Sequence, residues 1–166
     1  MIFIGEAFEG SGPNAAHINV VLGEKAELGN AYALAAASPG PGHVPFQAVL
    51  GPNLPAKPAT LFIAKAALRD ERHERMTWGP AQAGVAAGIT EALLSGALPP
   101  LAEEQWVAIA LVWVDPAASD AEAVFANNRA ATLAAARRAI DGGPSREALA
   151  DGLRSISNPF FTPGRH

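Results

Sequence analysis

One strand-like segment of this sequence carries polar side chains that could take part in chemistry. Residues 16–22 (AHINVVL) are rich in branched side chains and end at a glycine, which predicts a strand. Successive side chains of a strand point to opposite faces, so His17 and Asn19 share one face and the apolar residues share the other. We expect the apolar face to join the core. His17 and Asn19 then point together toward solvent, a cleft or a neighbouring molecule, although a half-exposed strand histidine without a function gives the same pattern.

A lone lysine marks a second strand-like segment. Residues 59–67 (ATLFIAKAA) are otherwise apolar except for one threonine, and alternation puts Lys65 on the same face as Leu61, Ile63 and Ala67. An ammonium group is costly to bury without a partner. Lys65 therefore either meets an anion or a polar ligand, or extends its charged end into water along an edge of the sheet.

The remaining candidate motifs predict less. His43 lies in a Pro- and Gly-rich loop, and the charged run 70–75 is typical of a solvated connection. Its His73–Glu74 pair lacks the HExxH spacing of a zinc site, and Gly10–Gly12 lacks the third glycine of a phosphate-binding loop. The absence of cysteine excludes disulfides, thiolate catalysis and iron–sulfur ligation. We expect no bound metal.

Composition narrows the class of protein further. The 166 residues fit one domain, which we place at 1–163, with 164–166 as a tail or an artificial remnant. A net charge of −4 provides no basic field for nucleic acid or anionic lipid. The longest apolar run, 106–114, is well below the ~20 residues of a membrane-spanning helix, and the N-terminus does not resemble a signal peptide. We therefore expect a cytoplasmic protein that binds neither nucleic acid nor membranes.

Periodicity and turn residues predict an α+β sandwich, with one sheet and helices packed mainly on one face. An extended, rigid connection is predicted for 51–58, which holds three prolines. The other predicted elements are strands at 1–8, 16–22, 44–50, 59–67 and 105–114, and helices at 24–37, 80–96, 118–141 and about 145–153.

Small residues have a particular place in this arrangement. About a fifth of the chain is alanine. In the predicted helix 80–96, Ala81, Gly84, Ala87 and Gly88 leave one side thin, which suits close contact with a sheet or a neighbouring helix. This composition predicts stability from close helix packing or from burial between subunits.

Several short motifs resemble the formaldehyde-activating enzyme family in order and spacing, over about residues 5–161. They are Gly5-Glu6-Ala7, Ala16-His17-Ile18, Pro52-Asn53-Leu54-Pro55, Lys57-Pro58, Thr60-Leu61, Lys65, Gly79-Pro80-Ala81-Gln82, Gly84-Val85-Ala86 and Asn158-Pro159-Phe160. The combination of the PNLP and KP motifs with the later GPAQ is specific to that family.

This resemblance implies a fold, an assembly and an activity. The fold is like the second domain of ribosomal protein S5, with a left-handed β-α-β crossover, and the assembly is a ring-shaped homopentamer with pterin sites between subunits. The activity is condensation of formaldehyde with tetrahydromethanopterin, or its dephospho form, to methylene-tetrahydromethanopterin and water, without a permanently bound cofactor. The resemblance makes His17 the general acid and assigns Lys65 and Gln82 to pterin binding and orientation.

Three positions at the implied pterin site depart from the family pattern. Asn19 stands where the family usually has Asp, Gln47 where it has Leu, and Ala67 where it has Thr. Asn keeps hydrogen-bonding capacity but loses the charge, and Ala loses a hydroxyl. The pattern indicates a divergent paralogue. Two alternatives stay open: a paralogue that binds or senses a one-carbon carrier without turnover, and a different aldehyde or small-ligand function on the same ring scaffold.

Overall fold

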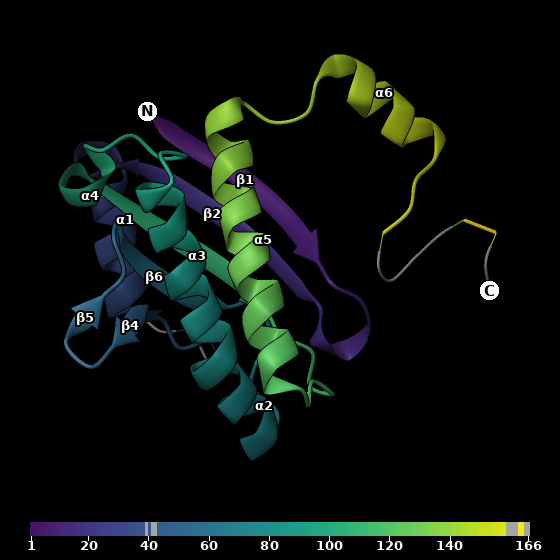
Figure 1. The fold of residues 1–166 in the computed structure, drawn as a ribbon, viewed down its shortest axis with the longest axis horizontal. Coiled ribbons are helices and arrows are strands. Elements are labelled where there is room, and N and C mark those ends of the chain that lie inside the picture. Colours follow the sequence, from purple (N-terminus) through teal and green to yellow (C-terminus); the bar gives the residue numbers. More distant parts are fainter. Residues whose placement is uncertain (39, 41–42, 159–162, 165–166) are drawn as a thin grey trace.

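The computed structural model describes residues 1–38, 40, 43–158 and 163–164 and has an α+β fold (Figure 1). Within these residues a five-stranded sheet has the order β1-β2-β7-β6-β3. Its strands pair antiparallel except for β6 and β7, which run parallel. A separate hairpin joins β4 and β5. The strands are β1 (Ile2–Glu9), β2 (Ala16–Glu24), β3 (Phe46–Gln47), β4 (Val49–Gly51), β5 (Leu54–Pro55), β6 (Ala59–Ala64) and β7 (Trp106–Trp113).

Helices cover the two faces of the sheet unequally. Figure 1 shows α3 (Gln82–Leu94) and α5 (Ala121–Asp141) side by side across one face. The main core lies beneath them, and α1 (Lys25–Ala37) packs over a smaller apolar cluster on the other face. The prediction of an α+β fold with helices mainly on one face is confirmed. The shorter elements are η1 (Gly12–Asn14), α2 (Glu71–Met76), the π-helical turn η2 (Thr77–Ala81), α4 (Ala102–Gln105) and α6 (Arg146–Arg154).

Three segments differ from the sequence predictions. The charged run at 70–75 is the helix α2, because the Asp70 side chain accepts a hydrogen bond from the backbone N–H of His73 and caps the first turn. The connection at 51–58 folds back on itself as the β4–β5 hairpin, with a left-handed turn at Asn53. The strand predicted at 44–50 is interrupted at Ala48, which separates β3 from β4.

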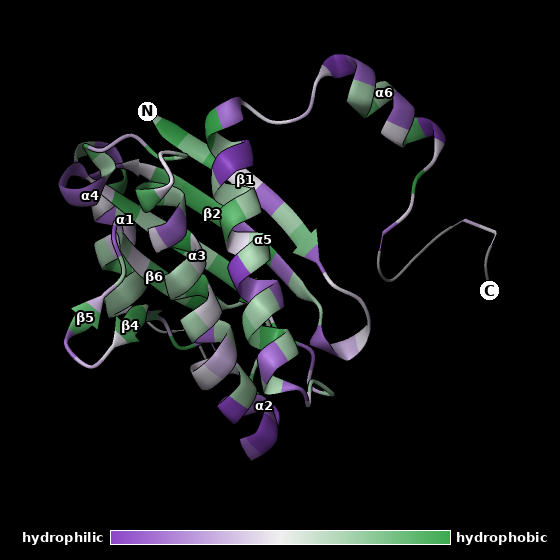
Figure 2. Ribbon diagram, viewed as in Figure 1, coloured by the Kyte–Doolittle hydropathy of each residue, from purple (hydrophilic) through white to green (hydrophobic). Residues whose placement is uncertain are grey.

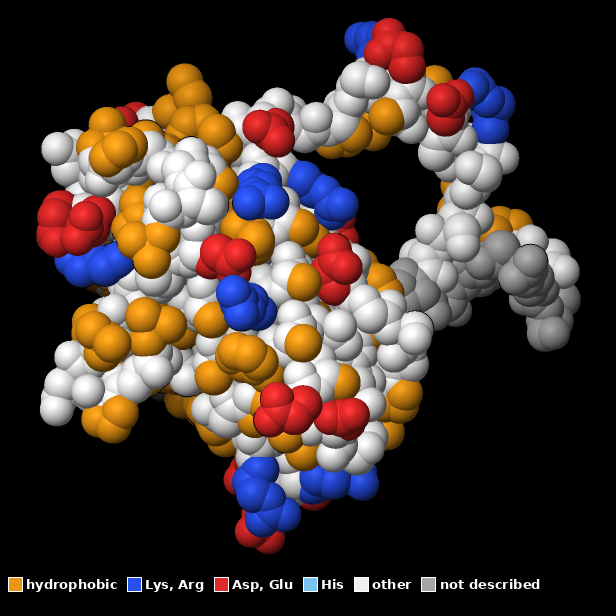
Figure 3. Space-filling view, viewed as in Figure 1, with side chains coloured by type: hydrophobic (Ala, Val, Ile, Leu, Met, Phe, Trp, Pro, Cys, Tyr) orange, Lys and Arg blue, Asp and Glu red, His pale blue; other side chains and the backbone are white. Residues whose placement is uncertain are grey.

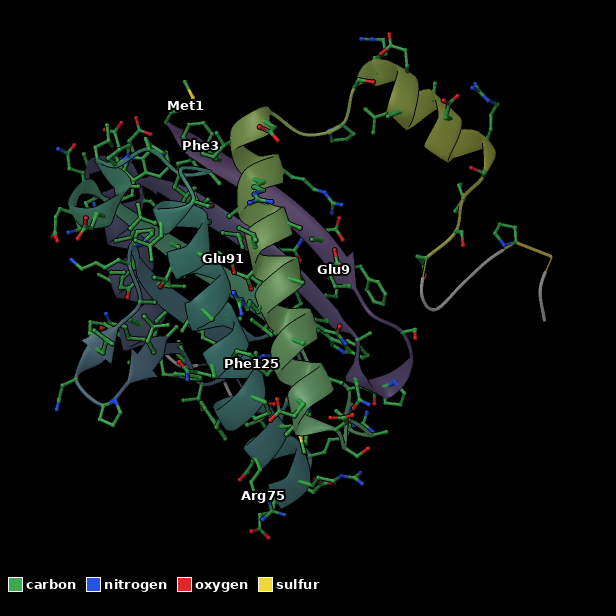
Figure 4. All side chains as sticks on the ribbon, viewed as in Figure 1. Met1, Phe3, Glu9, Arg75, Glu91 and Phe125 are labelled. Atoms are coloured by element: carbon green, nitrogen blue, oxygen red, sulfur yellow. The ribbon has the colours of Figure 1, made fainter. Side chains whose placement is uncertain are left out.

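Close backbone contacts explain the small residues. A Cβ atom added at Gly84 would lie 2.6 Å from the carbonyl oxygen of Phe125, and one at Gly88 would lie 2.5 Å from that of Arg129. The thin side predicted for helix 80–96 therefore contacts α5. Glu91 of α3, labelled in Figure 4, forms an ion pair of 2.8 Å with Arg129 of α5. Alanines buried within this one chain include Ala81, Ala86, Ala92, Ala131, Ala135, Ala136 and Ala139.

The helix α6 stands apart from the rest of the chain. It has no buried residue, and Figure 3 shows open space between it and the body. Figure 2 shows hydrophilic and hydrophobic residues alternating along it, whereas the strands behind α3 and α5 are mostly hydrophobic. No helix in the described ranges is long and apolar enough to cross a membrane. The motif residues Pro159 and Phe160 and the predicted tail residues 165–166 lie outside the described part of the chain.

Candidate functional site

The site residues of β2 lie on the sheet face opposite α3 and α5. Ile18 and Val20 are fully buried in the main core, and His17 and Asn19 are half-buried on the other face. The strand prediction for these residues is confirmed. In the ladder, His17 lies between Phe8 of β1 and Trp113 of β7, and residues directly opposite one another share a face.

A carboxylate accompanies the histidine. Oε1 of Glu6 lies 3.0 Å from Nε2 of His17, and the two side chains are 54% and 34% exposed. Glu6 pairs with Asn19 in the ladder, one step along the same face from the pair of Phe8 and His17. Sequence reasoning gave Glu6 no role at the site. Alternation along 1–8 places it on one side of its strand, but only the register between β1 and β2 brings it to His17.

Lys65 joins the same group from beyond the end of β6. Its backbone N–H donates to the carbonyl oxygen of Val112 at 2.8 Å, which extends the ladder by one step. Its Nζ donates to the backbone carbonyl oxygen of His17 at 3.4 Å. Burial lowers the pKa of Lys65 from its usual value, and the Glu6 carboxylate partly opposes this by raising it. The ammonium of Lys65 therefore has a polar partner in the backbone of His17, and Glu6 acts on it through its charge.

A second imidazole lies near this group. Nδ1 of His43 is 2.8 Å from the backbone carbonyl oxygen of Ala64, the residue before Lys65. A carbonyl oxygen only accepts, so Nδ1 of His43 carries the proton. The sequence placed His43 in a loop of little predictive value, and its proximity to β6 could not be read from local pattern.

The other residues assigned by resemblance lie apart from His17. Gln47 is exposed on the edge strand β3 opposite Leu61, and Ala67 is exposed three residues beyond β6. Gln82 begins α3 in the layer on the opposite face, and its Oε1 accepts a hydrogen bond of 2.6 Å from the backbone N–H of Val49. One chain therefore groups Glu6, His17, Asn19 and Lys65 and holds Gln82 elsewhere.

A cavity of about 500 Å³ lies at the edge of β1 and is lined by Ile4, Gly5, Glu6, Arg138, Asp141, Gly143 and Pro144. Glu6 thus borders both this cavity and the face that holds His17. Among the described residues, no three histidine, aspartate or glutamate side chains gather closely enough to hold a metal ion.

Comparison with known proteins identifies the family. The sequence model described as formaldehyde-activating enzyme matches residues 4–161, nearly the whole chain. The chain belongs to the formaldehyde-activating enzyme family. The resemblance seen in the sequence motifs is confirmed.

Members of the formaldehyde-activating enzyme family with curated names are of two lengths. The chain is 35% identical over 158 residues to the 5,6,7,8-tetrahydromethanopterin hydro-lyase of Methanosarcina barkeri, covering 95% of this chain and 89% of that protein. It is 37% identical over 145 residues to the bifunctional enzyme Fae/Hps of Methanococcoides burtonii, covering 87% of this chain and 37% of that protein. It is 38% identical over 150 residues to the bifunctional enzyme Fae/Hps of Methanoculleus marisnigri, covering 90% of this chain and 38% of that protein. The chain thus spans less than two fifths of the bifunctional relatives.

Proposed function

We propose that this chain condenses formaldehyde with tetrahydromethanopterin, or its dephospho form, to give methylene-tetrahydromethanopterin and water. The observation that carries the proposal is His17, an imidazole that can give and take a proton and stands part-exposed on a sheet face beside Glu6, Asn19 and Lys65. The name of the Methanosarcina barkeri relative, a tetrahydromethanopterin hydro-lyase, supports the same reaction.

The chemistry assigns His17 the role of general acid. An amine of the pterin adds to the carbonyl carbon of formaldehyde, which forms a C–N bond and a carbinolamine. Hydroxide is a poor leaving group, so the carbinolamine loses its oxygen readily only when that oxygen receives a proton. Protonated His17 donates this proton, the C–O bond breaks and water leaves. The second pterin amine closes on the resulting iminium, and the proton that it releases returns to His17.

The remaining polar residues serve binding. Lys65 and Asn19 present an ammonium and an amide next to His17 and are suited to orienting the pterin. The Gln82 oxygen is held by Val49, so its amide nitrogen is the atom offered to a ligand. We assign Gln47 and Ala67 to the same pterin site, with Ala67 offering no hydroxyl.

We further propose that this site lies between the subunits of a ring-shaped homopentamer. Support comes from the separation of Gln82 from His17 within one chain, which a neighbouring subunit would bridge.

We also propose that residues 1–163 form one domain of ribosomal protein S5 domain 2 type in a cytoplasmic protein. The parallel pairing of β6 with β7 across a helical connection supports the fold, and we expect that crossover to be left-handed.

A binding or sensing role is the second candidate. The loss of the family's usual carboxylate at Asn19 and hydroxyl at Ala67 favours it, because both changes remove groups that could assist turnover. Such a protein would hold the pterin carrier without accelerating the condensation.

The test compares the enzymatic rate with the spontaneous one. We expect wild-type protein to form methylene-tetrahydromethanopterin faster than background, and His17→Ala to lose roughly 100-fold or more of that acceleration. Glu103→Ala is the control, because α4 precedes β7 at the end of the strand away from His17. Wild type and His17→Ala both at background would overturn the proposed catalysis. Calorimetric binding of the pterin in that case supports the second candidate, and absence of binding contradicts both.

A further inference from the structure

The contact between Glu6 and His17 is built on rigid backbone. The two residues lie on adjacent antiparallel strands, and the neighbouring side chains Ala7 and Ile18 are fully buried. Gly5 is pressed against α5, where an added Cβ would lie 1.9 Å from the carbonyl oxygen of Ala135. These contacts hold both strands in register, so the placement of the Glu6 backbone on the strand next to His17 is set by the core and does not depend on a loop.

The backbone of Glu6 has a further anchor on α5. Nη1 of Arg138 donates a hydrogen bond of 2.9 Å to the backbone carbonyl oxygen of Glu6. The guanidinium therefore holds the main chain of this residue, while the Glu6 carboxylate lies on the His17 face. With the backbone held, only the side-chain torsions of Glu6 determine whether its carboxylate contacts the imidazole.

Glu6 supplies the negative charge at this histidine. The ladder neighbours of His17 are the aromatic Phe8 and Trp113, and Asn19 next to it along β2 is uncharged. The Lys65 ammonium contacts the backbone of His17 from the other side, and His43 contacts Ala64 next to that lysine. Within the described residues, Glu6 is the carboxylate that contacts the imidazole of His17.

A carboxylate at Nε2 determines which nitrogen is available to a ligand. An ionised carboxylate accepts hydrogen bonds and cannot donate one. Oε1 of Glu6 therefore favours the form of the ring that carries a proton on Nε2. In the neutral ring the lone pair then lies on Nδ1, while Glu6 contacts the ring at Nε2.

We propose that Glu6 is a positioning residue that keeps the proton of His17 on Nε2, so that Nδ1 is the nitrogen that exchanges a proton with the substrate. This inference rests on the proposed condensation. The imidazolium gives its Nδ1 proton to the carbinolamine oxygen, which leaves as water, and the neutral ring keeps its Nε2 proton beside Glu6. The second amine later returns a proton to Nδ1, so the cycle ends with the ring as it began.

The first test needs no activity. Two-dimensional NMR correlation of the ring protons with the ¹⁵N nuclei reports which nitrogen of a neutral histidine carries the proton. We expect the Nε2–H tautomer for His17 in the wild type, a mixture of tautomers in Glu6→Gln, and recovery of Nε2–H in Glu6→Asp. A wild-type ring with its proton on Nδ1 would overturn the inference, whatever the catalytic rate.

The second test is kinetic. We expect Glu6→Gln to lower kcat roughly tenfold or more with little change in KM, and Glu6→Asp to restore part of kcat. Glu9→Gln is the matched control, since it removes the same charge from the opposite side of β1. If Glu6→Gln matches Glu9→Gln in an active enzyme, the inference fails and the proposed function stands. If wild type itself is at background, the proposed function fails. The NMR measurement of the His17 tautomer then tests, by itself, whether Glu6 keeps the proton on Nε2.

Discussion

At the scale of single residues, Lys65 is a charged side chain partly buried at the sheet. Its pKa is lowered because burial disfavours the ammonium form, and the nearby Glu6 carboxylate opposes that effect only in part. The charged form is therefore less stable in the folded protein than in the unfolded chain.

The lowered pKa makes the stability of the fold depend on pH. The unfolded lysine keeps its usual pKa of 10.5, so between the folded pKa and that value the unfolded chain binds more protons. Stability contributed by Lys65 therefore rises with pH through this window. We expect Lys65→Met to raise the urea midpoint relative to wild type at pH 7, and the difference to shrink as the pH approaches 10.5. Lys65→Arg, which keeps the charge, serves as the control. An equal difference at both pH values would contradict the argument.

Strand alternation predicts the faces of these residues but not their partners. His17, Asn19 and Lys65 were placed correctly because the period of a strand is local. The partner Glu6 depends on the register between β1 and β2, and the contact of Gln82 with Val49 joins residues 33 positions apart. Neither contact can be predicted from the residue pattern of a single segment.

At the scale of elements, the packing of α3 on α5 depends on missing side chains. Gly88 approaches the α5 backbone so closely that a methyl group would lie 2.5 Å from a carbonyl oxygen. Alanine is the better helix former by about 1 kcal/mol, yet the clash forces the helices apart, which costs roughly 1–3 kcal/mol. The steric effect is the larger of the two.

We therefore expect Gly88→Ala to lower the free energy of unfolding by up to about 2 kcal/mol, as measured by urea denaturation. Gly152→Ala is a matched control, because Gly152 also lies in a helix but an added Cβ there meets nothing within 4 Å. That variant should be at least as stable as wild type, because it gains helix propensity without a clash. A Gly88→Ala protein at least as stable as Gly152→Ala would show that α3 and α5 can separate without cost.

The missed elements have partners distant in sequence. Alternating charge at 70–75 predicts solvent exposure, yet His73 is buried because its Nε2 lies 3.0 Å from the carbonyl oxygen of Val114 and its Nδ1 accepts from the backbone N–H of Arg69. A charge pattern describes the exposed side of a short helix and says nothing of the one residue that faces inward. The β4–β5 hairpin was missed for a similar reason, since prolines predict a stiff path but not its direction.

At the scale of the whole molecule, alanine contributes to packing inside the subunit. The sequence left open whether the alanines serve contacts within one chain or between chains. Part of those in α3 and α5, including Ala86, Ala92, Ala131 and Ala135, are buried within the described chain. Ala121, Ala126 and Ala130 of α5 are exposed and leave a thin surface open to contact with another subunit. Light scattering should give about five times the mass of the chain, and a monomer would contradict a site shared between subunits.

The separation of His17 from Gln82 gives a sharper test of that assembly. In a ring, each site would take His17 from one subunit and Gln82 from its neighbour, because a heterologous interface joins different surfaces of identical chains. His17→Ala and Gln82→Ala are each expected to be impaired alone. When the two variants are co-expressed and assemble at random, about a quarter of the sites combine an intact His17 with an intact Gln82. We expect the mixed protein to recover about that fraction of wild-type activity, measured against the two variants mixed as preformed assemblies. Activity equal to that of the mixture of preformed assemblies would mean that both residues of a site come from one chain.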